Sequence, residues 1–167
     1  MSEPSAAILD SQSVKTTEAG GERGYDAGKK VAGRKRHILV DTAGHLLEVV
    51  VHPASLQDRD GAKLVFNKMP HTLSQHLKMV WADGNYRGAL IEWVLDQFQL
   101  VLEIVARDPQ SSTFQVLPRR WVVERTFAWL GRYRRLSKDY ERCLLSSEAT
   151  VYIASIHTTL RRLAAYP

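Results

Sequence analysis

The chain has 167 residues, 44% of them hydrophobic, and a formal net charge of +5 with a pI near 9.5. This length and composition suit one globular domain that buries about 70% of its unfolded surface, and they exclude general disorder. No apolar run reaches the roughly 20 residues of a membrane span, and there is no signal peptide, so we expect a cytoplasmic protein with no membrane partner. The single cysteine, Cys143, excludes an internal disulfide framework and a cysteine-rich zinc site.

The first third of the chain is rich in β-forming residues. An apolar run predicts a strand over residues 6–14. The charged stretch 18–33, with its many glycines, is typical of a mobile loop. Two further runs, 36–40 and 46–52, flank a four-residue turn that ends in Gly44 and predict a hairpin.

Helices and strands alternate in the rest of the chain. Ser55 and Asp58 can cap a helix that ends near Lys68. Strands are predicted at 77–83 and 100–106, with a helix between them. Further predicted elements are the helix 89–98, a polar linker through 111–113, a long helix from Arg119, and a last helix from Ser146 with Tyr152, Ile156, Leu160 and Leu163 on one face.

This order of elements predicts an α/β fold. Strands joined by short turns pair antiparallel, whereas strands reached through helices are added in parallel. We therefore expect a mixed five-stranded sheet flanked by helices, in a single domain over 1–167. The first and fourth strands would be neighbours that both end at the middle of the sheet.

Three carboxylates stand where local sequence gives little structural reason for them. Asp10 and Asp83 each end an apolar run, and Glu124 lies among Trp121-Val122-Val123 and several arginines. A buried, unpaired carboxylate costs several kcal/mol, and converging carboxylates repel one another unless cations lie between them. The pattern therefore predicts a site for divalent metal ions and an enzyme that acts on phosphates.

Each of these three signals also has an ordinary structural explanation. Asp83 precedes Gly84 and suits a turn, and Asp10 suits a strand-end cap. Glu124 can pair with Arg120 one helical turn earlier, for a few tenths of a kcal/mol. The combination on two strands and a late helix is more specific than any one signal. The six histidines show no metal-ligand spacing.

Two segments concentrate positive charge. Residues 29–36 carry five cations and no acid, and residues 119–142 carry eight cations interleaved with aromatic rings. Such segments suit nucleic-acid backbones, although a solvated helix face over core aromatics gives the same composition. The predicted DNA contacts are Lys29, Lys30, Arg34, Lys35, Arg36, Arg87, Arg119, Arg120, Arg132 and Arg135.

Three strings occur in this order and resemble one family: LDSQSVKT, WADGNYRG and RRWVVERTFAWLGRYRRL. Together they resemble the catalytic part of bacterial insertion-sequence transposases of the DDE type, near the insertion-sequence-five and IS4-like groups. The resemblance covers essentially the whole chain, and Asp10, Asp83 and Glu124 match the family's catalytic triad. Arg120 matches an arginine four residues before the glutamate. Leu117 and Gly131 stand where the pattern has Tyr and Lys, and Arg132 is the candidate to substitute for that lysine.

The resemblance implies a ribonuclease-H-like fold and a two-metal enzyme. Asp10, Asp83 and Glu124 would bind two Mg²⁺ ions, with Mn²⁺ able to substitute, and would cut DNA by hydrolysis and join it by transesterification. The implied partners are the terminal repeats of the element, target DNA, a second copy of the chain on DNA, and an upstream-frame product. The implied location is the bacterial nucleoid.

Two other functions remain open from the sequence. Only nine residues precede Asp10, whereas relatives carry a DNA-recognition segment there. The chain could therefore be a catalytically incomplete remnant that only binds DNA or regulates a full-length transposase. A related nuclease without strand transfer is the third possibility.

Overall fold

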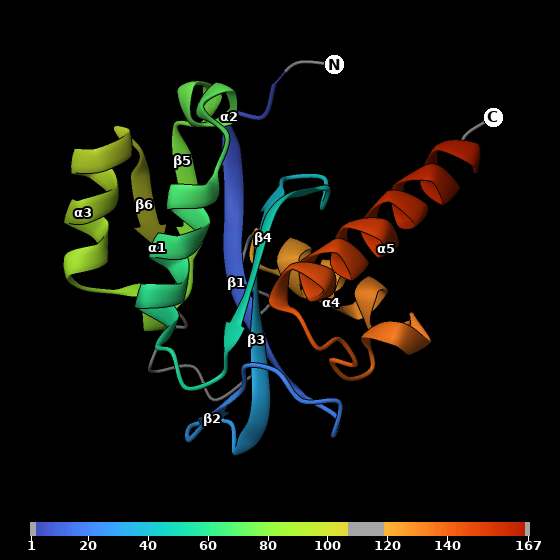
Figure 1. Cartoon of the computed structure of the whole chain (residues 1–167). Helices are drawn as coiled ribbons and strands as arrows, with labels where there is room; N and C mark the ends of the chain where they lie inside the picture. The colour runs from blue at the N-terminus through green and yellow to red at the C-terminus, as the bar shows by residue number, and fades with distance from the viewer. Residues whose placement is uncertain (1–2, 107–118, 166–167) are drawn as a thin grey trace, which may run out of the picture.

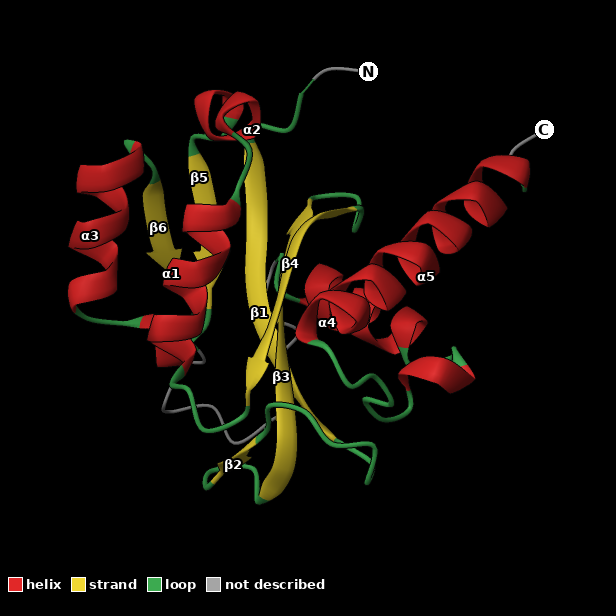
Figure 2. Ribbon diagram, in the orientation of Figure 1, coloured by secondary structure: helices red, strands yellow, loops and turns green. Residues whose placement is uncertain are grey.

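The computed structural model describes residues 3–106 and 119–165. Its centre is a mixed sheet in which β1 pairs antiparallel with β3 and parallel with β5 (Figures 1 and 2). β6 extends the parallel half, while β2 and β4 pair antiparallel with successive parts of β3. The strands are β1 Ala6–Lys15, β2 Gly24–Asp26, β3 Val31–Asp41, β4 Leu46–Pro53, β5 Met79–Ala82 and β6 Val101–Ile104. The mixed sheet is confirmed, with β2 as an additional short strand.

Helices cover both faces of this sheet and enclose two separate cores. α1, α2 and α3 lie on one side of the sheet, and α4 and α5 lie on the other (Figure 2). The helices are α1 Asp58–Lys68, α2 His71–His76, α3 Ala89–Phe98, α4 Trp121–Leu130 and α5 Leu144–Ala164, with short 3-10 turns η1 Gly84–Tyr86 and η2 Arg134–Leu136. No helix in the described ranges is long and apolar enough to cross a membrane.

Alternation along the strands decides which side chains meet α4. Ala7 and Leu9 of β1 join the core under α1 and α3, whereas Ile8 joins the core under α4 and α5. Val80 and Trp81 of β5 divide between the two cores in the same way. Because side chains on a strand alternate with a period of two, the positions two residues after Ile8 and Trp81 lie on the α4 side.

The predicted hairpin turn is confirmed between β3 and β4. One Asp41 carboxylate oxygen accepts hydrogen bonds from the backbone N–H groups of Ala43 and His45, both at 2.8 Å. Gly44 closes the turn with φ +87°, a left-handed conformation that favours glycine.

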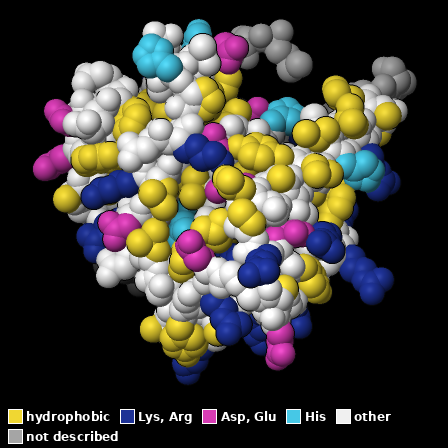
Figure 3. Space-filling view, in the orientation of Figure 1, with side chains coloured by type: hydrophobic (Ala, Val, Ile, Leu, Met, Phe, Trp, Pro, Cys, Tyr) yellow, Lys and Arg dark blue, Asp and Glu magenta, His cyan; other side chains and the backbone are white. Residues whose placement is uncertain are grey.

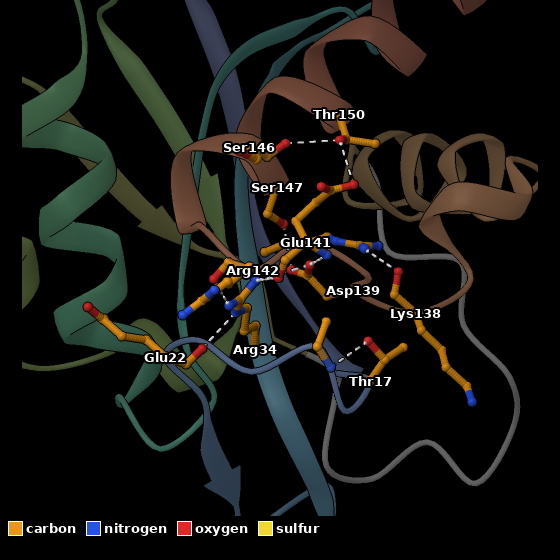
Figure 4. A network of polar contacts seen from close by, with 12 residues as sticks. Thr17, Glu22, Arg34, Lys138, Asp139, Glu141, Arg142, Ser146, Ser147 and Thr150 are labelled. Atoms are coloured by element: carbon orange, nitrogen blue, oxygen red, sulfur yellow. Dashed lines mark hydrogen bonds and ion pairs between the residues drawn. The ribbon is translucent and has the colours of Figure 1, made fainter.

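The predicted loop over 18–33 is more ordered than expected. It contains β2, and the buried Arg34 guanidinium fastens it to the C-terminal segment (Figure 4). Arg34 donates to the Glu22 carbonyl oxygen at 2.7 Å, to the Asp139 carboxylate at 3.1 Å, and to the Glu141 and Arg142 carbonyl oxygens. The loop prediction is therefore wrong for 24–26 and 31–33, which lie in β2 and β3, and it is confirmed for the turns at 18–23 and 27–30.

The predicted long helix is broken. α4 ends at Leu130, and the chain turns through η2 so that Leu136 enters the core and Asp139 reaches Arg34. Gly131 and Arg135, which the predicted helix would have included, therefore lie outside α4. α5 begins at Leu144 instead of Ser146, and the Ser147 hydroxyl donates to Asp139 at 2.5 Å.

Two smaller predictions also differ from the structure. The N-cap position of α1 is Gln57, which makes no side-chain cap hydrogen bond, and the Asp58 carboxylate pairs with Lys35. The short helix α2 was not predicted. The predicted polar linker and Leu117 lie outside the described residues.

Candidate active site

Strand register brings the first two predicted carboxylates together. β1 and β5 are parallel neighbours, with Ile8 opposite Trp81. Asp10 and Asp83 each follow by two residues, so they lie side by side on the face that α4 covers. α4 then carries Glu124 in its first turn, four residues after Arg120 at its N-terminal boundary.

One guanidinium nitrogen joins all three acids. Arg120 Nη2 lies 3.5 Å from Asp10 Oδ2, 3.7 Å from Asp83 Oδ2 and 3.6 Å from Glu124 Oε1. No two of these oxygens can therefore be farther apart than twice the longest of these distances. The structure thus brings together three side chains that are distant in sequence.

Backbone groups orient the two aspartates. Asp10 Oδ1 accepts a hydrogen bond from the backbone N–H of Ser11 at 2.7 Å, and Asp83 Oδ1 accepts one from the backbone N–H of Asn85 at 2.8 Å. In each residue the other carboxylate oxygen is the one that faces Arg120. The aspartates are mostly buried, at 15% and 20% side-chain exposure, whereas Glu124 is 60% exposed and has more freedom to rotate.

The cluster has an excess of negative charge. Burial raises the pKa of Asp10 from 3.8 to about 6, and the neighbouring charge of Asp83 adds to the rise. The Ser11 N–H, Arg120 and Lys29 act in the opposite direction without cancelling it. A carboxyl group destabilised in its charged form, beside further acids in a partly open site, is typical of a functional centre.

The donor set fits a hard divalent cation. Three carboxylates offer the oxygen ligands that Mg²⁺ and Mn²⁺ prefer, and the Asp10 pKa shows that more positive charge would stabilise the ionised cluster. In the present arrangement, no group of three or more His, Cys, Asp or Glu side chains within 3–106 and 119–165 is positioned as a metal site. The Arg120 guanidinium lies between the acids instead. Asp10, Asp83 and Glu124 are the residues that could hold the metal.

A buried polar network supports β1 from the α1 side. The Ser11 hydroxyl donates to Asp58 at 3.2 Å, and Lys35 Nζ donates to the same Asp58 oxygen at 2.9 Å. Lys35 also lies 3.5 Å from Asp26, which accepts a 2.6 Å hydrogen bond from the Ser13 hydroxyl. Sequence reasoning missed this network, because its members come from four elements with no shared spacing.

Tyr86 is a second feature that the sequence did not single out beyond its motif. It is 1% exposed, and its hydroxyl has no hydrogen-bond partner among the described residues. Burial raises the pKa of Tyr86 well above its usual range, and the charges of Asp10 and Asp58 add to the rise. The aromatic motif position thus places a buried, neutral phenol in the core under α1 and α3, near enough to Asp10 and Asp58 for their charges to raise its pKa.

The predicted DNA contacts divide into exposed and buried residues. Arg34 and Arg36 are 0% and 2% exposed, and Arg36 donates to the carbonyl oxygens of Leu136 and Lys138. Lys35 is enclosed in the network described above. Burial contradicts DNA contact by these three residues, whose charges have internal partners. The exposed members are Lys29, Lys30, Arg87, Arg119, Arg132 and Arg135, and Arg120 belongs to the acidic cluster.

The fold has a counterpart among solved structures. The crystal structure of the catalytic core domain of BIV integrase matches with a TM-score of 0.53 at 16% sequence identity, covering 91% of this chain and 81% of that chain. This likeness concerns the fold. The chain therefore has the ribonuclease-H-like fold of integrase catalytic cores, as the sequence led us to expect.

Sequence comparison identifies the family. The family model described as "Transposase DDE domain" matches residues 1–156, and the chain belongs to that family. Over 117 residues it is 29% identical to a Burkholderia cepacia protein described as "Putative transposase for insertion sequence element IS402". That alignment covers 66% of this chain and 54% of the relative, so the chain spans about half the relative's length. Placement in the insertion-sequence-five or IS4-like groups stays a prediction.

Proposed function

We propose that this chain is a transposase catalytic domain that cleaves DNA at the ends of an insertion sequence and joins it to a target. The observation that carries the proposal is the shared contact of Asp10, Asp83 and Glu124 with one nitrogen of Arg120. Membership in the DDE transposase family supports it. The fold is that of an integrase catalytic core, which supports the same class of chemistry.

The three carboxylates would hold two divalent cations, Mg²⁺ or Mn²⁺. When bound, such ions supply a polarised water or 3′-hydroxyl and neutralise charge on the leaving oxygen of an in-line displacement. The backbone hydrogen bonds at Asp10 and Asp83 hold each carboxylate in one orientation, so little reorganisation is needed at that position. The exposed Glu124 can adjust its side chain to the substrate.

Arg120 has a different task in this proposal. Its guanidinium neutralises the acids in the structure described here, and it can turn to a DNA phosphate once other cations compensate them. A guanidinium matches phosphate oxygens in a bidentate geometry, which favours a positioning role for Arg120 at the reacting strand.

The exposed cations would bind the DNA backbone. Lys29 lies close to the centre, with its Nζ 3.4 Å from the Ser11 carbonyl oxygen. Lys30, Arg87, Arg119, Arg132 and Arg135 are the other proposed contacts. The proposed ligands are the terminal repeats and target DNA, with a homodimer on DNA and an upstream-frame product as further proposed partners.

A nicking assay tests the proposal. Supercoiled plasmid is incubated with wild-type protein and Mg²⁺ or Mn²⁺, and compared with Asp83→Asn and with Asp96→Asn, an exposed acid on α3. We expect nicking by the wild type and by Asp96→Asn, and a loss of at least 100-fold in Asp83→Asn, an order of magnitude typical of essential catalytic groups. Equal nicking by wild type and Asp83→Asn would refute the assignment.

Two further outcomes separate the alternatives. A protein that shifts DNA with a steep salt dependence, but binds no divalent metal in calorimetry and does not nick, is a DNA-binding remnant. A protein that nicks DNA but does not join a pre-cut end to a target is a nuclease of the same fold.

A further inference from the structure

An open pocket of about 450 Å³ lies next to the acidic centre and has no role in the chemistry proposed above. Three segments contribute to its lining: the β2–β3 turn with Lys29, the start of α1 with Arg59, and η1 with Asn85. All three side chains are exposed, and they offer an ammonium, a guanidinium and an amide to a ligand.

The pocket borders the acidic centre through the residues that orient its two aspartates. β1 continues beyond the end of β5, and no other strand of the described ranges takes the place of β5 there. The backbone of Ser11 therefore has free groups at this edge: its N–H donates to Asp10 at 2.7 Å, and its carbonyl oxygen accepts from Lys29 Nζ at 3.4 Å. Asn85, which lines the pocket, donates its backbone N–H to Asp83 at 2.8 Å.

Hydrogen bonds of the β2–β3 turn hold Lys29 at this place. Asp26 Oδ1 accepts the backbone N–H of Lys29 at 3.0 Å, and Asp26 Oδ2 accepts the hydroxyl of Ser13 on β1 at 2.6 Å. Lys35 Nζ on β3 lies 3.5 Å from the same Oδ2 atom. The turn is thus fastened to both strands, so the Lys29 backbone loses little freedom when the side chain binds a ligand.

Arg59 reaches the same region from α1. A Cβ atom added to Gly88 would lie 3.4 Å from Arg59 Nη1, so the guanidinium lies against the backbone of the WADGNYRG string that carries Asp83. Gly88 has a φ of +95°, a conformation that favours glycine, and its lack of a side chain leaves this space to Arg59.

The two acids of the pocket are already engaged by internal partners. Asp26 and Asp58 both contact Lys35 Nζ, at 3.5 and 2.9 Å, and their side chains are only 9% and 16% exposed. The charges that the pocket presents to solvent are therefore those of Lys29 and Arg59. In the view of Figure 3, Lys and Arg side chains gather over the lower half of the molecule, where the β2–β3 turn lies in Figure 1.

We propose that Lys29, Arg59 and Asn85 form a subsite for a phosphate of the DNA strand, next to the phosphate that reacts at the acidic centre. A phosphodiester is an anion with two free oxygens, which suits two cationic donors and an amide. A DNA strand carries one phosphate per about 3.4 Å of helix axis, so a strand held at the centre brings a neighbouring phosphate to this pocket. The location rests on the proposed function, but the binding itself needs neither metal nor cleavage.

An NMR titration in EDTA tests the subsite separately from catalysis. The probe is a thymidine dinucleotide with a single phosphodiester, and the matched probe is its neutral methylphosphonate analogue. Backbone amide shifts are followed in wild type, Lys29→Gln and Arg59→Gln. The control is Lys78→Gln, because Lys78 is an exposed cation at the other end of β5 from Asp83.

We expect the amide signals of Gly28, Lys29 and Asn85 to shift with the dinucleotide and not with its neutral analogue. Lys29→Gln and Arg59→Gln should each weaken this binding by about 10-fold, the effect of losing one hydrogen bond to a charged group. Lys78→Gln should bind as the wild type does. Shifts confined to other parts of the surface, equal shifts with the neutral analogue, or an unchanged affinity of Lys29→Gln would each refute the subsite.

A failure of the catalytic assignment gives a different result. Glu124→Gln, on α4, should lose nicking and keep the dinucleotide shifts. A wild type that binds the dinucleotide in this pocket but does not nick plasmid supports the subsite and contradicts the transposase assignment. A wild type that nicks plasmid but shows none of these shifts contradicts the subsite alone.

Discussion

The Asp10→Asn substitution should stabilise the metal-free protein at neutral pH. Asp10 has a pKa of about 6 in the fold, against 3.8 ordinarily, because burial and Asp83 disfavour its charged form. At 1.36 kcal/mol per pH unit, this rise corresponds to about 3 kcal/mol of folding free energy. An asparagine at this position has no charge to bury and can still accept the hydrogen bond from Ser11.

The sign follows from proton binding. Between pH 4 and 6 the folded protein keeps a proton on Asp10 that the unfolded chain has released, so the free energy of unfolding falls as pH rises through this range. The stability advantage of Asp10→Asn over wild type should therefore grow by about 2.4 kcal/mol between pH 4 and pH 8. Any constant effect of the substitution cancels in this difference.

Urea denaturation in EDTA at several pH values measures the stability difference between Asp10→Asn and wild type. Asp26→Asn is the control, because its stability difference from wild type should change with pH in the opposite direction. Burial raises the pKa of Asp26, but hydrogen bonds from Ser13 and Lys29 and the charge of Lys35 outweigh burial and leave the pKa below 3.8. Asp26 thus stabilises the fold above pH 3.8, and this contribution is lost as pH falls through its lowered pKa. Asp26→Asn should therefore cost most at neutral pH and little in acid.

The same urea denaturation, repeated with Mg²⁺ in place of EDTA, tests metal binding at the acidic cluster. A cation bound to the folded protein adds RT ln(1 + [L]/Kd), about 2.7 kcal/mol at 100 times Kd. Mg²⁺ should stabilise the wild type at pH 8 and have much less effect on Asp10→Asn. If the stability difference between wild type and Asp10→Asn does not change with pH, the pKa of Asp10 is not raised in the folded protein, and the reasoning about the acidic cluster fails.

Three further predictions follow from the same contacts. Arg34→Met should destabilise the protein by about 3–5 kcal/mol in urea denaturation, because it leaves the Asp139 carboxylate buried and unpaired. Arg132→Gln, at an exposed proposed DNA contact, should reduce the slope of log K against log salt by about 1 in DNA titrations without changing the melting temperature. Gly61→Ala should destabilise the protein by about 1–3 kcal/mol, since the added Cβ would lie 2.4 Å from the His37 ring; an unchanged midpoint would show that the ring can move.

Local pattern was sufficient for the sheet and for two of the three acids. The apolar runs before Asp10 and Asp83 specify buried strands, and alternation fixes the face on which each acid lies. The parallel pairing of β1 and β5 could be deduced from the intervening helix. Glu124 was a weaker prediction, because only the packing of α4 against the sheet shows that it reaches the same point.

The local sequence pattern did not distinguish buried cations from cations that are free to bind DNA. The run 34–36 looks like a DNA-binding patch, but it lies in β3 between two neighbouring strands. Arg34 finds Asp139 at a separation of 105 positions, and Lys35 finds Asp58 in another element. No periodicity links such partners, so a buried cation and a phosphate ligand have the same appearance in sequence.

The predicted length of the helix from Arg119 was wrong for a related reason. The apolar and arginine-rich pattern continues past Gly131, but burial of Leu136 and the Asp139–Arg34 pair require the chain to leave the helix. On α5 the predicted stripe exists, yet Ile156, Leu160 and Leu163 are 57%, 58% and 62% exposed, because the helix extends beyond the sheet (Figure 1). Periodicity identifies an apolar face but does not identify what covers it.

The net charge of +5 is accordingly a poor measure of the charge available to DNA. Arg34 and Lys35 are neutralised inside the fold by Asp139, Asp26 and Asp58, and Arg120 is shared among three acids. The binding of Mg²⁺ at those acids would release Arg120 and remove negative charge from the centre in a single step. DNA affinity should therefore rise when divalent metal is added, at constant ionic strength, and this rise should be absent when Asp10 and Asp83 are both replaced by asparagine.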